Sequence, residues 1–284
     1  MAAIDIHRIR EAAAGEDIAI ETVDETGSTN RVLMESPFGL VPASPRLLAA
    51  ARQTAGRGRR GRGWVMEPGR SVAFSLAIER TVAATAPPPS GLSIAVGVAI
   101  AQALAAYAPE LRLKWPNDLQ RDGRKLGGIL VESRRGAGAA SSIERLVIGI
   151  GINLSTPRDP DAAIGQAVTG LFDSSSRLVA ANSSAQPLTP EAVIGLVAAA
   201  ANAAVRHLLA EGLAPFRATW QQFDALYGQP VVLLDHFGAV VQQGTARGID
   251  ESGALLLETA DGVCTVSSGE VSLRALRSPA GDLA

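Results

Sequence analysis

The chain has 284 residues, 47% of them hydrophobic, so it is long enough for one large domain and a second, smaller one. Its 26 Lys and Arg residues oppose 28 Asp and Glu residues, and the net charge of -2 excludes a general attraction to nucleic acid or anionic lipid. The single cysteine excludes a disulfide framework and a cysteine-based zinc site, and charges near the N-terminus exclude a signal peptide, so we expect a cytoplasmic protein without a membrane span.

Strands and loops are predicted for the first part of the chain. Ile18 to Val23 predicts a strand, and the polar residues Asp24 to Asn30 predict a loop leading into a short helix. Leu47 to Ala51 predicts a second strand, and alternating apolar residues from Val72 to Ile78 predict a third. Between these two, residues 56–63 read Gly-Arg-Gly-Arg-Arg-Gly-Arg-Gly and predict a loop.

An apolar helix and a hairpin are predicted next. Apolar residues run almost all round the segment from Gly91 to Tyr107, which predicts a buried helix capped by Ser90. Leu111 to Trp115 predicts a strand, and Asp122-Gly123 is a two-residue hairpin signal before the strand from Leu126 to Glu132.

The next region combines a strand, a connection and two helices. Leu146 to Leu154 predicts a hydrophobic strand. Residues 155–190 are rich in Ser, Ala, Pro and Asp and predict a long surface connection with at most one short helix, around Val168 to Phe172. Helices are then predicted from Glu191 to Glu211 and from Pro215 to Leu226.

A change of pattern after Leu226 predicts a domain boundary. Gly228-Gln229-Pro230 breaks the helical pattern, and short strands follow from Val231, with turns at residues 236–238, 251–253 and 261–262. We therefore predict domains at residues 1–226 and 227–284, the second being a small β-barrel.

The Gly/Arg loop, residues 56–63, invites two functional interpretations. Gly56, Gly58 and Gly61 match the dinucleotide fingerprint G-x-G-x-x-G, but that fingerprint must open a helix, and the residues after this loop lead to a strand. Its four arginines could instead bind carboxylate or phosphate through bidentate hydrogen bonds. Taken alone, the loop leaves open both anion capture and a flexible RNA-binding segment.

Three further segments combine polar groups with strand ends. Lys114 to Leu119 reads Lys-Trp-Pro-Asn-Asp-Leu, in which the Asn and Asp could place oxygen ligands on Mg²⁺, although an Asx turn with a solvated lysine explains the hexapeptide equally well. Lys125 to Glu132 sets a second cation before a strand with two glycines, and Gly149 to Leu154 alternates glycine with isoleucine before a polar Asn.

Together these segments resemble the biotin protein ligases, the biotin-[acetyl-CoA-carboxylase] ligases. The resemblance rests on five motifs in order: Gly27 to Asn30, Gln53 to Arg62, Lys114 to Leu119, Lys125 to Glu132 and Gly149 to Leu154. It extends into Gly244 to Asp250 and Gly269 to Arg274 near the C-terminus.

The resemblance implies an α+β fold, with a central mixed β-sheet and helices like those of class II synthetases, followed by an SH3-like β-barrel. It implies that biotin and ATP react to give biotinyl-5'-AMP and pyrophosphate, and that biotin then passes to one lysine of a biotin carboxyl carrier protein, with Mg²⁺ present. Family members that repress transcription carry a winged-helix domain, and too few residues precede Ile18 for one, so we expect no nucleic-acid partner. The oligomeric state stays open, and a homodimer is compatible with the sequence.

The resemblance also assigns residues to ligands. The biotin-contacting positions are Ser28, Thr29, Asn30, Gln53, Arg57, Gly58, Arg59 and Lys125, and the catalytic candidates among them are Lys125 and Arg59. The nucleotide-binding positions are Arg60, Arg62, Trp64, Asn117 and Arg274, and the metal-binding positions are Asp118 and Asn153. Cations suit this chemistry because a carboxylate must approach a polyphosphate of like charge.

Three alternatives remain. A lipoate or octanoate transferase shares the fold superfamily, but its Arg-Arg-x-Ser-Gly-Gly-Gly run is absent from the sequence. A non-catalytic biotin sensor or a nucleic-acid-binding protein that uses the Gly/Arg loop would belong to a different functional class.

Overall fold

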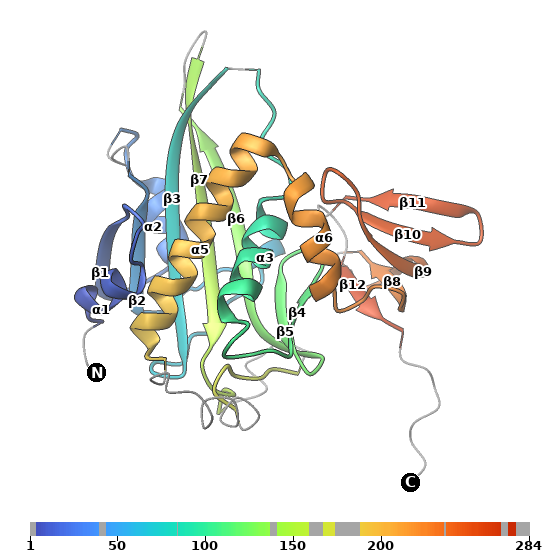
Figure 1. The fold of residues 1–284 in the computed structure, drawn as a ribbon, viewed down its shortest axis with the longest axis horizontal. Helices are drawn as coiled ribbons and strands as arrows, with labels where there is room; N and C mark the ends of the chain where they lie inside the picture. Colours follow the sequence, from blue (N-terminus) through green and yellow to red (C-terminus); the bar gives the residue numbers. More distant parts are fainter. Residues whose placement is uncertain are drawn as a thin grey trace.

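The computed structural model describes residues 4–39, 44–83, 85–136, 141–158, 167–173, 188–235, 237–267 and 272–276. These residues form a seven-stranded mixed sheet with helices on both faces and a five-stranded antiparallel sheet near the C-terminus (Figure 1). The predicted α+β fold class is confirmed.

The large sheet has the spatial order β1-β2-β3-β7-β6-β5-β4. Its strands are β1 (Ala19–Thr26), β2 (Arg46–Gln53), β3 (Ser71–Ala83), β4 (Leu111–Lys114), β5 (Asp118–Arg121), β6 (Arg124–Arg135) and β7 (Ser141–Asn153). Strands β1 and β2 are parallel, and the other neighbouring pairs are antiparallel. The helices are α1 (Ile6–Ala12), α2 (Thr29–Glu35), α3 (Leu92–Leu104), α5 (Pro190–Glu211) and α6 (Ala214–Phe223).

The two faces of the large sheet carry different side chains, as β7 illustrates. Ile148, Ile150 and Ile152 are buried in one core together with residues of α3 and α5, the helices that cross the sheet in Figure 1. Gly149 and Gly151 alternate with them and therefore face the other way. On that second face Ser75 of β3 pairs with Gly149 and Gly128 of β6 pairs with Gly151, and these small residues leave room for a ligand.

Helix α2 covers part of the glycine-bearing face. Its Leu33 packs in a small separate cluster on Leu48, Ala77 and Val147, one residue from each of the neighbouring strands β2, β3 and β7. The N-terminus of α2 therefore lies beside the uncovered part of this face.

Two local predictions about turns have different outcomes. The two-residue Asp122-Gly123 turn connects β5 to β6 with φ values of 51° and 69°, the left-handed conformations that a type I′ hairpin needs, so the hairpin is confirmed. The prediction that Ser90 caps α3 is wrong, because the residue before the helix is Gly91, with φ 74°. A side chain at Gly91 would also collide with Leu213, so the position requires glycine.

No helix forms around Val168 to Phe172, where the sequence predicted at most one short helix. Val168 instead forms a parallel bridge to Lys125, and the amide of Leu171 donates to the carbonyl of Asn153 at 2.9 Å. Backbone groups here bond to the sheet rather than to each other, because the segment lies where β7 ends. Thr169 and Leu171 are buried, so these residues do not belong to a surface connection.

The C-terminal sheet has the order β11-β10-β9-β8-β12. Its strands are β8 (Pro230–Leu234), β9 (Val240–Ile249), β10 (Leu255–Thr259), β11 (Gly262–Val266) and β12 (Ser272–Ala275). The barrel prediction needs correction: within the described part of the chain, the edge strands β11 and β12 do not pair with each other, so the sheet stays open. The expected boundary at residue 226 falls between α6 and β8, and of the predicted turns, His236 lies outside the described residues.

Helix α5 is long and apolar enough to span a membrane by length and composition. Ten of its residues are buried, however, and residues such as Val197 and Ala201 share one core with those of α1 and α3. Its composition is therefore that of a core helix in this fold.

Candidate functional site

The glycine-bearing face of the large sheet forms the floor of a cavity of about 490 Å³. All fifteen site residues predicted from the sequence line it: Ser28, Thr29, Asn30, Gln53, Arg57, Gly58, Arg59, Arg60, Arg62, Trp64, Asn117, Asp118, Lys125, Asn153 and Arg274. Segments that are up to 246 positions apart, from Ser28 to Arg274, therefore meet in one place.

Polar side chains at the start of α2 form a network at one end of the cavity. The amide of Thr29 donates to Gln53 Oε1 at 2.7 Å, and its hydroxyl lies 2.7 Å from the hydroxyl of Ser75. Ser75 in turn donates to Asn30 Oδ1 at 2.5 Å. A Cβ atom at Gly149 would lie 2.2 Å from Asn30 Oδ1, so the glycine makes room for this network.

Glu132 connects α2 to the Gly/Arg loop. Its Oε2 accepts a hydrogen bond from Asn30 Nδ2 at 2.9 Å, and its Oε1 lies 3.1 Å from Arg57 Nη2. Glu132 shares the face of Ser75, since both positions pair across β7 in register. Neither Ser75 nor Glu132 was predicted as a site residue, and each is recognisable only from the register of strands distant in sequence.

The Gly/Arg loop closes on itself and does not open a helix. The amide of Trp64 donates to the carbonyl of Gly56 at 2.9 Å, and the amide of Gly58 donates to that of Arg62 at 2.7 Å. A Cβ atom at Gly56 would lie 2.3 Å from the Trp64 carbonyl oxygen, so this close approach requires glycine. The loop thus lacks the helix N-terminus on which a dinucleotide fingerprint depends.

Arg59 extends from the loop across the cavity. Its Nη1 donates to Asn117 Oδ1 at 3.2 Å, and Asn117 Nδ2 donates to the carbonyl of Ile129 at 2.8 Å. Burial lowers the pKa of Arg59, and Asp118 acts in the opposite direction. The loop and the Asn117 turn are therefore joined directly over the cavity.

A β-bulge places Lys125 in the cavity. Pairing between β5 and β6 runs from Leu119 opposite Gly127 to Gln120 opposite Lys125, so Leu126 is the extra residue. Leu126 is fully buried in the core, whereas Lys125 Nζ lies 2.8 Å from Asp118 Oδ1 on the cavity side. Without the extra residue, Leu126 would face the cavity and Lys125 the core. The bulge therefore places both side chains correctly.

Lys114 is a buried cation beside this pair. It is 7% exposed, pairs with Asp118 in register and lines the cavity. Burial, together with the charge of Arg274, lowers its pKa to about 8, while Asp118 opposes the shift. The sequence identified Lys114 as part of a motif but not as a site residue, because its burial depends on β5 and β12.

Trp64 lies directly on the sheet. A Cβ atom at Gly151 would come within 2.5 Å of Trp64 Cε2, so the indole ring packs on a strand without a side chain. The indole Nε1 is buried and has no hydrogen-bond acceptor among the described residues. It is therefore available to an acceptor on a ligand.

The C-terminal sheet also reaches the site. Trp115 Nε1 donates to the carbonyl of Gly253 at 3.0 Å, and Arg274 of β12 lines the cavity. Among the described residues, ten Arg and Lys side chains thus line one cavity of a chain that is slightly acidic overall: Arg52, Arg57, Arg59, Arg60, Arg62, Arg70, Lys114, Lys125, Arg158 and Arg274. The described residues contain no group of three or more His, Cys, Asp or Glu side chains that could hold a metal ion by themselves.

The cavity can accordingly hold a ligand with a polar, uncharged end and an anionic end. The α2 network offers donors and acceptors at one end, and the cations face a polyanion at the other.

Comparison with known proteins identifies the family. Residues 23–153 match the Biotin/lipoate A/B protein ligase family, and residues 227–274 match the Biotin protein ligase C terminal domain. The chain is 36% identical to the bifunctional ligase/repressor BirA of Escherichia coli strain K12 over 250 residues, which cover 87% of this chain and 71% of BirA. It is 33% identical to the biotin--[acetyl-CoA-carboxylase] ligase of Paracoccus denitrificans, covering 87% of this chain and 97% of that enzyme.

A solved structure agrees with these relatives. The biotin protein ligase from Aquifex aeolicus in complex with biotin and ATP superimposes with a TM-score of 0.69 and 25% identity, over 91% of this chain and 99% of that one. The chain therefore belongs to the biotin protein ligase family, whose members are ATP-dependent ligases.

Proposed function

We propose that this protein activates biotin with ATP to biotinyl-5'-AMP and transfers the biotinyl group to one lysine of a biotin carboxyl carrier protein. The observation that supports this most directly is the cavity, which has a polar network at one end and ten Arg and Lys residues in its lining. The Aquifex aeolicus relative was solved with both biotin and ATP, the two ligands that such a cavity suits.

The α2 network suits the ring end of biotin. A buried urea group needs a partner for each donor and acceptor, and Thr29, Asn30 and Gln53 offer amide and hydroxyl groups already held in place by Ser75 and Glu132. Because these partners fix the side chains before a ligand binds, little ordering is left for the binding step.

The cations suit the carboxylate and the triphosphate. A carboxylate oxygen must attack the α-phosphorus while pyrophosphate leaves, and at an effective dielectric near 20 each pair of unit charges 4 Å apart repels by about 4 kcal/mol. Lys125 and Arg59, both in the cavity, would offset that repulsion, and Arg60, Arg62 and Arg274 would face the nucleotide. Catalysis here would be positioning and electrostatics, without a covalent enzyme intermediate.

Trp64 and Asn117 would complete the nucleotide site. The indole ring packs on Gly151 and lines the cavity, where a base could stack on it, and Asn117 is hydrogen-bonded to Arg59. Trp64 follows the Gly/Arg loop directly, and Asn117 accepts a hydrogen bond from Arg59 of that loop.

The donor groups fit Mg²⁺ that brings most of its ligands from water and phosphate. Asp118 supplies one carboxylate and Asn153 one amide, on the same face of the sheet with β6 between their strands. When bound, the ion would neutralise charge on the phosphates. Lys125, already 2.8 Å from Asp118, would lie beside it.

The second half-reaction needs an amine from another protein. The carrier lysine would attack the acyl carbon of biotinyl-5'-AMP as a neutral amine, and AMP would leave. We place the reaction in the cytoplasm, where ATP and the carboxylase meet.

Transfer to a carrier domain tests the proposal. The purified protein is incubated with biotin, ATP, Mg²⁺ and the biotin-accepting domain of acetyl-CoA carboxylase, and intact mass spectrometry follows the acceptor. One biotinyl group on one lysine is expected, with the Lys→Arg acceptor as the control. A parallel reaction contains lipoate in place of biotin. An acceptor that gains a lipoyl group there but no biotinyl group in the first reaction, or no group in either, would contradict the proposal.

A further inference from the structure

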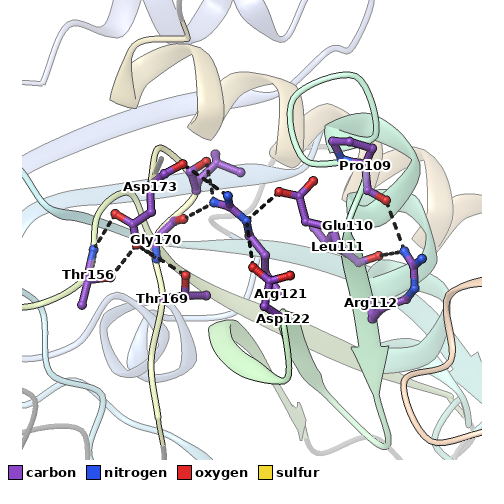
Figure 2. A network of polar contacts seen from close by, with 11 residues as sticks. Pro109, Glu110, Leu111, Arg112, Arg121, Asp122, Thr156, Thr169, Gly170 and Asp173 are labelled. Carbon is purple, nitrogen blue, oxygen red and sulfur yellow. Dashed lines mark hydrogen bonds and ion pairs between the residues drawn. The ribbon is translucent and has the colours of Figure 1, made fainter. Parts of the chain in front are cut away.

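Arg121, at the end of β5, is buried although it lies outside the cavity lining. Its side chain is 1% exposed, and a guanidinium so deeply buried needs several partners. Nη1 donates to the carbonyl of Gly170 at 2.8 Å, and Nη2 donates to that of Asp173 at 3.2 Å (Figure 2). Nε lies 2.8 Å from Glu110 Oε1, close enough for an ion pair although the N–H does not point at that oxygen.

Asp173 fixes the other end of the same segment. Its carboxylate accepts hydrogen bonds from the amide of Gly170 at 2.7 Å and from both the amide and the hydroxyl of Thr156 (Figure 2). Burial acts to raise the pKa of Asp173, but these hydrogen bonds outweigh it and hold the pKa below its usual value. Residues 169–173 are thus held between β5 and the turn after β7.

The held segment is the backbone partner of Lys125. The amide of Lys125 donates to the carbonyl of Ala167 at 2.8 Å, and its carbonyl accepts from the amide of Thr169 at 2.9 Å. Lys125 lies beside the bulge at Leu126, where the pairing between β5 and β6 changes register. The backbone amide and carbonyl of Lys125 are therefore held by residues 167–169. Arg121 holds the residues that follow, through the carbonyl of Gly170.

We propose that Arg121 is a positioning residue for the ligase reaction, which acts by fixing residues 167–173 against Lys125 and so holding its ammonium group beside Asp118. Arg121 touches neither substrate. The inference rests on the proposed function, because it assumes that Lys125 acts in adenylate formation.

The chemistry of arginine suits this role. One planar guanidinium bonds the carbonyls of Gly170 and Asp173 through two different nitrogens held in a fixed fork, whereas lysine and glutamine each carry a single donor nitrogen. Arg121→Met keeps much of the volume and removes all of these bonds. We expect it to slow single-turnover biotinyl-AMP formation by about 10-fold at saturating biotin and ATP, with the KM values nearly unchanged, because misplacement of a catalytic group affects the chemical step.

A double-mutant cycle separates positioning from general damage. If Arg121 acts through Lys125, adding Arg121→Met to Lys125→Ala should slow the residual reaction by less than about twofold. Equal losses in both backgrounds would overturn the inference. If Lys125→Ala alone reacts at a normal rate, the role of Lys125 in the proposed function fails instead, so the two failures are distinguishable.

Glu144→Gln provides a matched control. Glu144 is fully buried and forms ion pairs with Arg80 at 2.6 Å and Arg135 at 2.8 Å. It lies near the start of β7, whereas Asn153 of the site ends that strand. Its loss should lower the midpoint of thermal unfolding without slowing adenylation at 20 °C. Equal slowing by Glu144→Gln and Arg121→Met would show a general effect of destabilisation and overturn the inference.

A second variant covers the case in which Arg121→Met does not fold. Asp173→Asn loosens the same segment from its other end and leaves β5 intact. We expect slower adenylation and faster hydrogen exchange at the amides of Lys125 and Thr169, compared with the wild-type protein. Unchanged exchange at both amides together with an unchanged rate would refute the positioning role.

Discussion

Replacing Lys114 by methionine should stabilise the fold and weaken the enzyme. Lys114 is 7% exposed, and methionine is of similar length but carries no charge. Asp118 would not be left alone, because Lys125 remains 2.8 Å from it. The substitution therefore removes one of several like charges without creating an unpaired buried acid.

The magnitude follows from the pKa of Lys114, which falls from 10.5 to about 8 on folding. Each pH unit is worth about 1.4 kcal/mol, so below pH 8 the charged side chain destabilises the fold by roughly 3 kcal/mol. The unfolded chain binds more protons than the folded one between pH 8 and pH 10.5. Wild-type stability should thus rise over this window as the buried amine becomes neutral, whereas the Met variant lacks this contribution.

Urea unfolding at two pH values measures the effect. We expect Lys114→Met to be more stable than wild type by roughly 3 kcal/mol at pH 7 but by only about 1 kcal/mol at pH 9.5. A bound triphosphate would favour the charged amine, so the variant should also gain less stability from ATP. A variant of equal or lower stability at pH 7, or a difference that does not change with pH, would refute the reasoning.

Three other substitutions test the site. Lys125→Ala should lower the rate of biotin-dependent pyrophosphate release by at least about 100-fold, because a charge beside the reacting groups is lost, and a near-normal rate would remove Lys125 from the mechanism. Arg59→Gly should break the hydrogen bond to Asn117 and let biotinyl-AMP escape faster, as measured by filter retention of labelled adenylate; unchanged retention would contradict that role. Gly149→Ala would place a methyl group 2.2 Å from Asn30 Oδ1, so isothermal titration should show at least about tenfold weaker biotin binding, and equal affinity would show that the network tolerates displacement.

Local patterns were sufficient to predict much of the fold. The alternation of Gly149 and Gly151 with isoleucines indicated a strand, and the structure shows that it separates a ligand-bearing face from a core face. The Asp122-Gly123 signal predicted its hairpin, because a type I′ turn depends on those two residues alone. Strands and turns that depend on contiguous residues could thus be predicted without knowledge of the sheet order.

Features that depend on distant segments could not be predicted in this way. Ser75 and Glu132 reach the site because β3, β7 and β6 are neighbours, and the helical interpretation of Val168 to Phe172 failed because that segment bonds to β6 and β7. Arg121 illustrates the same limit, since its hydrogen-bond partners lie about fifty residues away in the sequence. The open edge of the C-terminal sheet likewise depends on which strands pair.

Exchange of labelled pyrophosphate into ATP tests the central claim most directly, because it reports adenylate formation without a carrier protein. The account predicts exchange that requires biotin and that lipoate does not support. Lys125→Ala should slow this exchange by at least about 100-fold, while Glu144→Gln should leave it intact. Exchange that proceeds equally without biotin, or its absence when biotin, ATP and Mg²⁺ are all present, would contradict the account.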